Sequence, residues 1–316
     1  MSFTPEGGSI GSMTPSTGTP TVPIPAATVI LIRDQGGQVQ VYLLKRSSHS
    51  RFMPGNYVFP GGTVSHEDTD ADFWNDYVDM DRGQVASRFA PDGGGLGVED
   101  AMAYGIAAIR ETFEEASILL GRRTIAIAKG MGSLRHERGC EALSGTWLRE
   151  LVLPGGWILT LSALACWSHW ITPRARSRRY DTRFFVARIP DGQECRPDHR
   201  ETTHGIWVGP EEALWRNQRG TLPLSPPALT TLHELLSYPS VKALEKETSA
   251  RPWGAPRVPR LIPIAEGGLL LLPWDPDYRS QTIKVAVEGL ERNRAPVGRA
   301  FSRLWYHKGI WLPLIP

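Results

Sequence analysis

Three glutamates in the middle of the chain could bind a metal ion together. Glu111, Glu114 and Glu115 are spaced i, i+3 and i+4, so their carboxylates share one face if the segment is helical. Close carboxylates repel one another unless a cation neutralises them, and hard oxygen ligands suit Mg²⁺ or Mn²⁺ bound together with substrate phosphates. Arg110, one residue earlier, could hold a carboxylate in place from the side. For this hexapeptide alone, a solvated Glu-rich helix face is the more common interpretation.

A basic and glycine-rich segment upstream carries groups that suit a phosphate. Arg46 and Arg51 precede Gly55 and the sequence Phe59-Pro60-Gly61-Gly62. Glycine lets the backbone approach a phosphate or metal closely, and a guanidinium makes forked hydrogen bonds to phosphate oxygens. Because the two segments are complementary parts of one metal–pyrophosphate site, their joint presence favours such a site over a solvated helix face.

The two segments together resemble the Nudix box, G-x5-E-x7-R-E-U-x-E-E-x-G-U, in which U is a bulky aliphatic residue. Gly62 and the charged residues of 110–115 match its glycine and its R-E-U-x-E-E core. Residues 46–62 resemble the coenzyme A (CoA) signature of CoA diphosphatases. Residues 170–173 and 178–185 are similar to the nineteenth-type Nudix branch, which consists of acyl-CoA diphosphatases. The resemblance runs from about residue 26 to residue 237.

The chain departs from the Nudix pattern in two places. Gly62 and Arg110 are 48 positions apart, so about 34 extra residues split the box. We assign an insertion to residues 63–100, which carry seven acids and no Lys or Arg between 66 and 81. Asp68 falls by count at the first Glu of the box, and we assign it no role. Ser117 replaces the last glycine of the box, and neither change removes a metal ligand.

The resemblance implies metal ligands, substrate contacts and a base. The ligands of Mg²⁺ or Mn²⁺ would be three carboxylates and a backbone carbonyl, namely those of Glu111, Glu114, Glu115 and Gly61. The contacts to the CoA-type substrate would come from the upstream segment, namely from Arg46, Arg51, Gly55, Phe59 and Gly62. Arg110 would orient Glu111, and the general base would be Glu111 or Glu201.

The implied activity is hydrolysis of the pyrophosphate of CoA or acyl-CoA. The products would be 3′-phosphoadenosine 5′-phosphate and (acyl-)4′-phosphopantetheine. One alternative keeps the enzyme class and changes the substrate to NADH, ADP-ribose or another nucleoside diphosphate derivative. A second alternative is a Nudix module that senses a nucleotide without catalysis, and the three intact glutamates argue against it.

A further basic segment follows the middle of the chain. Four arginines lie in a loop that precedes an expected strand at 182–189, namely Arg174, Arg176, Arg178 and Arg179. Clustered arginines suit a phosphate, here the 3′-phosphate or the adenosine end of the substrate. A solvated basic loop is an equally good interpretation.

The elements that must position these residues can be read from apolar spacing. Short β-branched and apolar runs at 28–32 and 39–44 predict two strands around a turn at 34–37. A helical stripe over 99–120 predicts the helix of the three glutamates, ended by Gly121. Together with the resemblance, this pattern predicts an α+β fold, a Nudix-type α/β/α sandwich around a mixed sheet.

The domain organisation follows from composition. Residues 1–25 are rich in Ser, Thr, Gly and Pro and lack a basic start or an apolar core, so we expect a disordered tail rather than a targeting sequence. The Nudix domain would span 26–248. Residues 249–316 are Pro-rich and then show hairpin-like runs, which predicts a β-rich extension that forms a dimer contact or covers the site.

Charge and cysteine content restrict the partners and the compartment. Lys+Arg is 35 and Asp+Glu is 33, so the near-neutral chain has no global field for nucleic acid or an anionic membrane. The most apolar stretch, 151–167, is too short and broken to span a bilayer. Three cysteines without a paired spacing indicate a reducing setting. Because the chain ends Leu314-Ile315-Pro316 rather than in a Ser-Lys-Leu-like address, we expect it in the cytoplasm.

Overall fold

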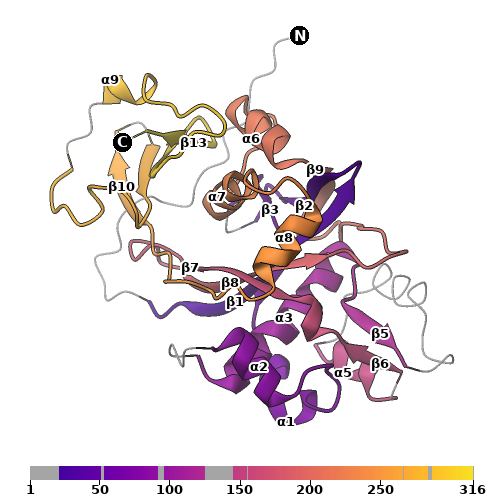
Figure 1. Cartoon of the computed structure of the whole chain (residues 1–316). Helices are drawn as coiled ribbons and strands as arrows, with labels where there is room; N and C mark the ends of the chain where they lie inside the picture. The colour runs from indigo at the N-terminus through magenta and orange to yellow at the C-terminus, as the bar shows by residue number, and fades with distance from the viewer. Residues whose placement is uncertain are drawn as a thin grey trace.

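The computed structural model describes residues 21–50, 53–91, 96–124, 145–154, 156–265, 267–283 and 287–315. A seven-stranded mixed sheet lies at its centre and carries helices on both faces (Figure 1), which confirms the predicted sandwich. The strands of this sheet are β1 (Ile24–Gln35), β2 (Gln38–Arg46), β3 (Tyr57–Val58), β4 (Gly61–Thr63), β7 (Ala165–Ile171), β8 (Tyr180–Arg188) and β9 (Thr202–Val208).

The sheet is organised around β1. Its second half forms a hairpin with β2, and its first half pairs antiparallel with β4. On its other edge it runs parallel to β8, which pairs in turn with β7. A parallel neighbour requires a long crossover, and the intervening helices supply it. The two strands expected at 28–32 and 39–44 lie within β1 and β2, and β1 begins two residues before the expected domain boundary at 26.

Alternating side chains along β1 supply both faces of the sheet. Val29 and Leu31 are buried on one face, and Ile30 and Ile32 are buried on the other. The first face is covered by α1 (Ala71–Trp74), α2 (Arg82–Phe89), α3 (Val98–Ala116) and α5 (Trp147–Val152). The second face is covered by α6 (Pro210–Gln218), α7 (Pro226–Leu235) and α8 (Val241–Thr248).

The acidic insertion folds into short helices rather than an open loop. It forms the 3-10 helix η1 (His66–Thr69) and helices α1 and α2, which pack against α3. Several of its acids start these helices: Asp70 accepts a hydrogen bond from the backbone N–H of Phe73, and Asp81 accepts one from that of Gln84. The described residues that follow α3 form the two-stranded sheet of β5 (Gly121–Arg123) and β6 (Trp157–Leu159) and the 3-10 helix η2 (Leu161–Ala163).

Helix α3 ends earlier than the sequence predicts. The expected end at Gly121 is wrong, because Ser117 adopts the left-handed conformation with φ 62° and ψ 22°. Its backbone N–H donates to the Phe113 carbonyl at 2.9 Å and closes the last turn. The buried residues after it, Ile118 to Leu120, continue into the core without helical structure.

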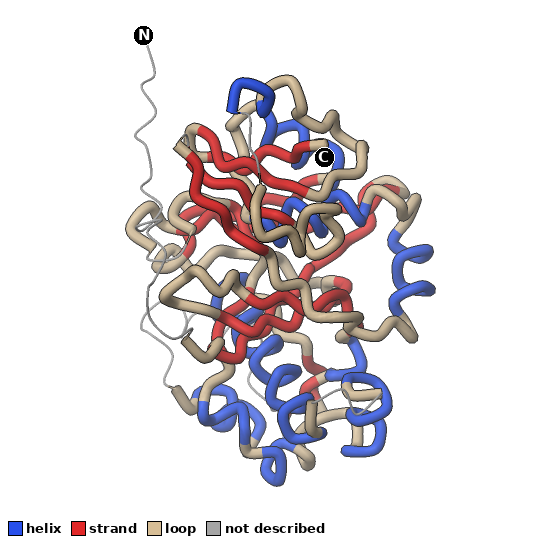
Figure 2. Tube along the Cα trace, turned by 90° about the vertical axis from the view of Figure 1, so that its left-hand side faces the viewer, coloured by secondary structure: helices blue, strands red, loops and turns tan. Residues whose placement is uncertain are grey.

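The C-terminal part forms a second sheet. Strands β10 (Arg260–Ile264), β11 (Gly267–Leu271), β12 (Arg303–His307) and β13 (Ile310–Leu314) pair in chain order, with α9 (Val287–Leu290) between β11 and β12. Both hairpins expected in the extension are therefore present. Figure 2 shows these strands at one end of the molecule and the helices of the insertion at the other. Within the described ranges, we find no helix with the length and apolar character needed to cross a membrane.

Candidate active site

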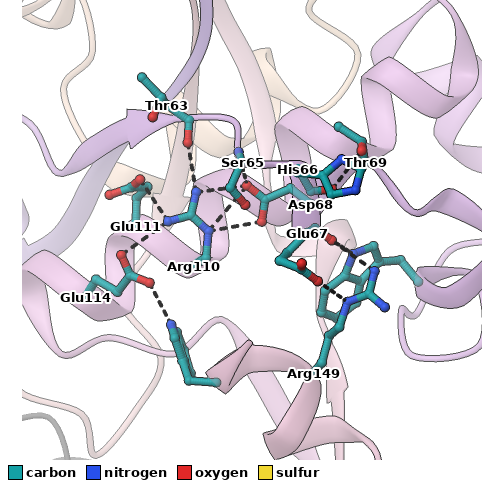
Figure 3. A network of polar contacts seen from close by, with 12 residues as sticks. Thr63, Ser65, His66, Glu67, Asp68, Thr69, Arg110, Glu111, Glu114 and Arg149 are labelled. Atoms are coloured by element: carbon teal, nitrogen blue, oxygen red, sulfur yellow. Dashed lines mark hydrogen bonds and ion pairs between the residues drawn. The ribbon is translucent and has the colours of Figure 1, made fainter. Parts of the chain in front are cut away.

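Arg110 is the centre of a buried polar network that starts from α3 (Figure 3). Its Nη1 donates to Glu111 Oε1 at 2.9 Å and to Glu114 Oε2 at 3.2 Å, one turn further along the helix. Its Nη2 donates to the Thr63 carbonyl at 2.8 Å, which ties the helix to β4. Because a guanidinium is planar, these bonds fix the Glu111 carboxylate relative to Arg110, and the catalytic role of Arg110 stays a prediction.

Asp68 completes this network, and the sequence analysis missed it. Arg110 Nε and Nη2 donate to its carboxylate at 3.0 and 2.8 Å, and Asp68 is only 1% exposed. Asp68 also accepts from the backbone N–H of Ser65 at 2.7 Å. The signal was available, since Asp68 falls at the acidic position by count from Gly62. The ion pair brings together two residues that the insertion separates by 42 positions.

Glu111 and Glu115 are buried carboxylates whose negative charges the protein balances only in part. Burial raises the pKa of Glu111 to about 7 against the lowering effect of Arg110, and the charge of Glu114 adds to the rise. Burial and the charge of Glu111 raise the pKa of Glu115 well above its usual range, against the effects of the Gly61 N–H and Arg46. Two adjacent carboxylates in this state favour a proton or a bound cation.

The Gly61–Gly62 turn lies directly against these carboxylates. The backbone N–H of Gly61 donates to Glu115 Oε2 at 2.9 Å. A Cβ atom on Gly62 would overlap with the carboxylate of Glu111, so a larger residue there would displace this carboxylate. The turn thus brings its backbone close to two carboxylates, whereas its expected approach to a phosphate or metal and the role of the Gly61 carbonyl in metal binding stay predictions.

The upstream segment divides into residues of the site and residues that support it. The side chain of Arg46 is held by Ser50 Oγ at 2.9 Å and lies close enough to Glu115 to lower its pKa. Phe59 is buried in the core and contributes to the cleft wall. Gly55 is absent from the lining of the cleft, and its φ of 72° explains the glycine by the turn it makes. The prediction for Arg51 lies outside the described residues.

Glu201 lies at the same site from a distant part of the chain. It lines the cleft beside Glu111, and its charge raises the pKa values of both Glu111 and Glu115. The backbone N–H of Ser47 donates to the Glu201 carbonyl at 2.9 Å, which joins the upstream segment to the start of β9. Glu201 thus shares the cleft with Glu111, and its role as general base stays a prediction.

These groups face a cleft of about 1210 Å³. Gly61, Gly62 and Glu111 lie in its wall, whereas Glu115 lies beneath the surface, behind the Gly61 N–H. The C-terminal sheet also lines the cleft, through Leu261, Leu270, Tyr306 and Trp311. Of the two expectations for the extension, covering the site is therefore the one that the described residues support.

The four clustered arginines separate into two groups. Arg176 and Arg178 line the cleft, while Arg174 is absent from its lining. Arg179 is buried, and its guanidinium donates to the carbonyls of Thr172 and Thr21 at 3.1 and 2.8 Å, so it fixes the loop and the start of the chain's described part. Two of the four arginines can therefore reach a substrate.

The donor set fits a hard divalent cation. Glu111, Glu114 and Glu115 offer only oxygen ligands, and burial raises the pKa values of Glu111 and Glu115, a cost that a bound cation would offset. Glu114 is turned toward Trp147, whose Nε1 donates to it at 2.6 Å. Accordingly, no group of three or more His, Cys, Asp or Glu side chains is gathered as a ready ligand cluster among the described residues.

Comparison with known proteins identifies the family of this chain. The family model of the NUDT19 Nudix domain matches residues 21–235. The chain is 32% identical over 311 residues to the acyl-coenzyme A diphosphatase NUDT19 of Gallus gallus, covering 84% of this chain and 81% of that protein. It is 28% identical over 309 residues to the protein of the same name from Xenopus laevis, with 84% and 80% covered.

A solved structure shares the fold. The crystal structure of a Nudix hydrolase from Alicyclobacillus acidocaldarius superposes with a TM-score of 0.58 at 25% identity. The match covers 73% of this chain and 99% of that one.

Proposed function

Since the chain belongs to the NUDT19 Nudix domain family and is a Nudix pyrophosphohydrolase, we propose that it hydrolyses the pyrophosphate bond of CoA and acyl-CoA. The observation that carries the proposal is the cleft that joins Glu111 and the Gly61–Gly62 turn to Arg46. Curated relatives that the chain matches over most of their length are named acyl-coenzyme A diphosphatases, which supports this substrate class.

The cleft suits a large substrate with unlike ends. Its volume of about 1210 Å³ is above the range of about 300–1000 Å³ that is common for small-ligand pockets. Guanidinium groups of Arg46 and Arg200 line one part of it, and apolar side chains line another. CoA combines an anionic 3′-phosphonucleotide with a long, nearly uncharged pantetheine arm.

Each residue of the site has a defined task in this proposal. Glu111, Glu114 and Glu115 hold Mg²⁺ or Mn²⁺ with the help of the Gly61 carbonyl, and Arg110 keeps Glu111 in place. The bound cation would neutralise charge on the pyrophosphate and lower the pKa of a water. Arg46 and Arg51 bind phosphate oxygens, and Glu201 or Glu111 accepts the proton of the attacking water. The products are 3′-phosphoadenosine 5′-phosphate and (acyl-)4′-phosphopantetheine.

Turnover of a substrate mixture tests the proposal. The protein is incubated with Mg²⁺, then with Mn²⁺, and with CoA, acyl-CoA, NADH and ADP-ribose, and the products are identified by mass spectrometry. We expect selective release of 3′-phosphoadenosine 5′-phosphate. Cleavage of NADH or ADP-ribose alone would keep the hydrolase and reject CoA as substrate, and binding of nucleotide without any cleavage would favour a sensor.

The general base can be distinguished from the metal ligands by the pH dependence of kcat. Replacement of Glu201 by Gln removes the candidate base without touching the α3 carboxylates, so we expect a lower kcat and loss of the acidic limb of the kcat profile. An unchanged profile would assign the base to Glu111.

We also infer a cytoplasmic location and a small-molecule substrate without nucleic-acid or membrane partners. Light scattering would show whether the protein forms a homodimer.

A further inference from the structure

The cleft has two parts of different chemistry that meet at Gly62 and Glu111. One part, near the ends of β2 and β9, is lined by polar groups such as Arg46, His49 and Glu201. The other part, which we call the apolar arm, carries Arg176 and Arg178 together with six aromatic and aliphatic side chains, those of Trp170, Phe184, Leu261, Leu270, Tyr306 and Trp311. The Gly61–Gly62 turn therefore has Arg46 and Glu201 on one side and a region rich in aromatic and aliphatic side chains on the other.

The floor of the apolar arm is the central sheet itself. Thr63 of β4 lies opposite Ala26 of β1, which lies opposite Thr182 of β8, which lies opposite Trp170 of β7. All four of these residues line the cleft. Four neighbouring strands span three strand spacings, or about 14 Å, so the arm extends well beyond the reach of a pyrophosphate.

The roof of the apolar arm is one face of the C-terminal sheet. Alternation along β10 sends Leu261 toward the cleft and the shared core, whereas Ile262 packs on the opposite face. Tyr306 and Trp311 are cross-strand neighbours with ring centroids 5.0 Å apart. Asn217 of α6 donates to the Trp311 carbonyl at 2.8 Å, which fixes this strand over the domain.

We propose that the apolar arm binds the thioester-linked acyl chain of the substrate, so that the C-terminal sheet sets the preference for chain length. This inference rests on the proposed function. An acyl-CoA carries its anionic nucleotide on one side of the pyrophosphate and its pantetheine and acyl chain on the other, which matches the two parts of the cleft. Arg176 and Arg178, which also line the cleft, suit the amide and thioester carbonyl oxygens of that arm.

Binding measurements without turnover test this inference. Affinities for CoA, octanoyl-CoA and dodecanoyl-CoA are measured by calorimetry in EDTA, below the concentration at which the ligands form micelles. Because each buried methylene adds to affinity, we expect dodecanoyl-CoA to bind the wild-type chain at least about tenfold more tightly than CoA. The Leu261→Asp variant should lose this gain, so that it binds dodecanoyl-CoA no more tightly than it binds CoA.

The matched control is Ile262→Asp, which places the same charge one residue away on the opposite face of the same strand. It should keep the dependence on chain length. Equal affinity of the wild-type chain for all three ligands would overturn the proposal, as would an equal loss of the chain-length effect in both variants. Turnover of CoA with Mg²⁺, measured on the same samples, reports separately on the proposed hydrolase activity.

Discussion

At the scale of single residues, the site is built from carboxylates that the protein leaves under-compensated. Glu115 accepts a hydrogen bond from the backbone N–H of Gly61, and burial and the charge of Glu111 raise its pKa. Replacement by Gln keeps an acceptor for Gly61 and removes the charge, so we expect the fold to persist and kcat to fall at least about 100-fold, or about 2.7 kcal/mol. The exposed Glu212→Gln serves as control, and an unchanged rate at saturating Mg²⁺ would remove Glu115 from the metal site.

The pKa of Glu111 predicts how stability changes with pH. Folded, metal-free protein keeps a proton on Glu111 up to about pH 7, whereas the unfolded chain releases it near 4.5. The folded state binds more protons in this window, so the free energy of unfolding falls as pH rises through it. We expect Tm in EDTA to decrease between pH 5 and 8, and Glu111→Gln to flatten the decrease. An equally steep decrease in the variant would contradict this assignment.

Asp68 gives a second prediction at this scale. Its removal leaves the buried Arg110 without its main partner, which typically costs about 3 kcal/mol or more. We expect Asp68→Ala to lower the free energy of unfolding, measured by denaturant titration, by that amount. Asp72→Ala, in the same insertion but with an exposed ion pair to Arg82, should change it by less than about 1 kcal/mol. Similar losses in both variants would show that the buried pair has no special role.

The sequence predicted the α3 glutamates and Arg110 because their spacing is local to one helix. It did not predict which residues of the upstream segment line the site and which only support it, since that depends on tertiary contacts. Gly55 and Phe59 were assigned to substrate binding, and the structure gives one a turn and the other a largely buried side chain. The position of Asp68 could be found by counting from Gly62, but only the fold shows that the insertion leaves this residue beside Arg110.

At the scale of elements, the end of α3 matters because it fixes the register of the glutamates. Ser117 holds a left-handed conformation that glycine adopts without strain and that a β-branched residue resists. Its hydroxyl also donates to the Arg196 carbonyl at 3.3 Å. We expect Ser117→Val to lower stability by about 2 kcal/mol and Ser117→Gly by less than about 1 kcal/mol, measured by thermal unfolding. A comparable loss in both would assign the cost to the hydrogen bond instead.

The strands show the limit of local sequence patterns. Apolar alternation located β1 and β2 because a hairpin with a short turn is a local structure. The two-residue strand β3 and three-residue strand β4 carry too few side chains for any pattern, and their positions follow from the pairing partners β2 and β1. The short helices of the insertion could not be predicted from the sequence either, because their hydrophobic side chains pack against α3 and form no periodic pattern of their own.

At the scale of the whole molecule, the C-terminal sheet and the Nudix domain share one core. Leu270 and Leu304 of that sheet lie in the same buried cluster as Leu229 of α7 and Ile30 of β1. The sequence analysis separated the extension at 249 because composition changes there, and composition carries no information on packing. We expect a single cooperative transition by calorimetry for the intact chain, and two separable transitions would show that the sheet folds independently.

The parallel pairing of β1 with β8 also governs how the chain acquires its structure during synthesis. Ile24 pairs with Tyr180, so more than 150 residues leave the ribosome before the edge of β1 meets its partner. During that interval β1 can already pair with β2 and β4, but its edge toward β8 stays open to other chains. The floor of the cleft therefore forms late, and a chaperone that shields this edge would be of most use to the unfinished protein.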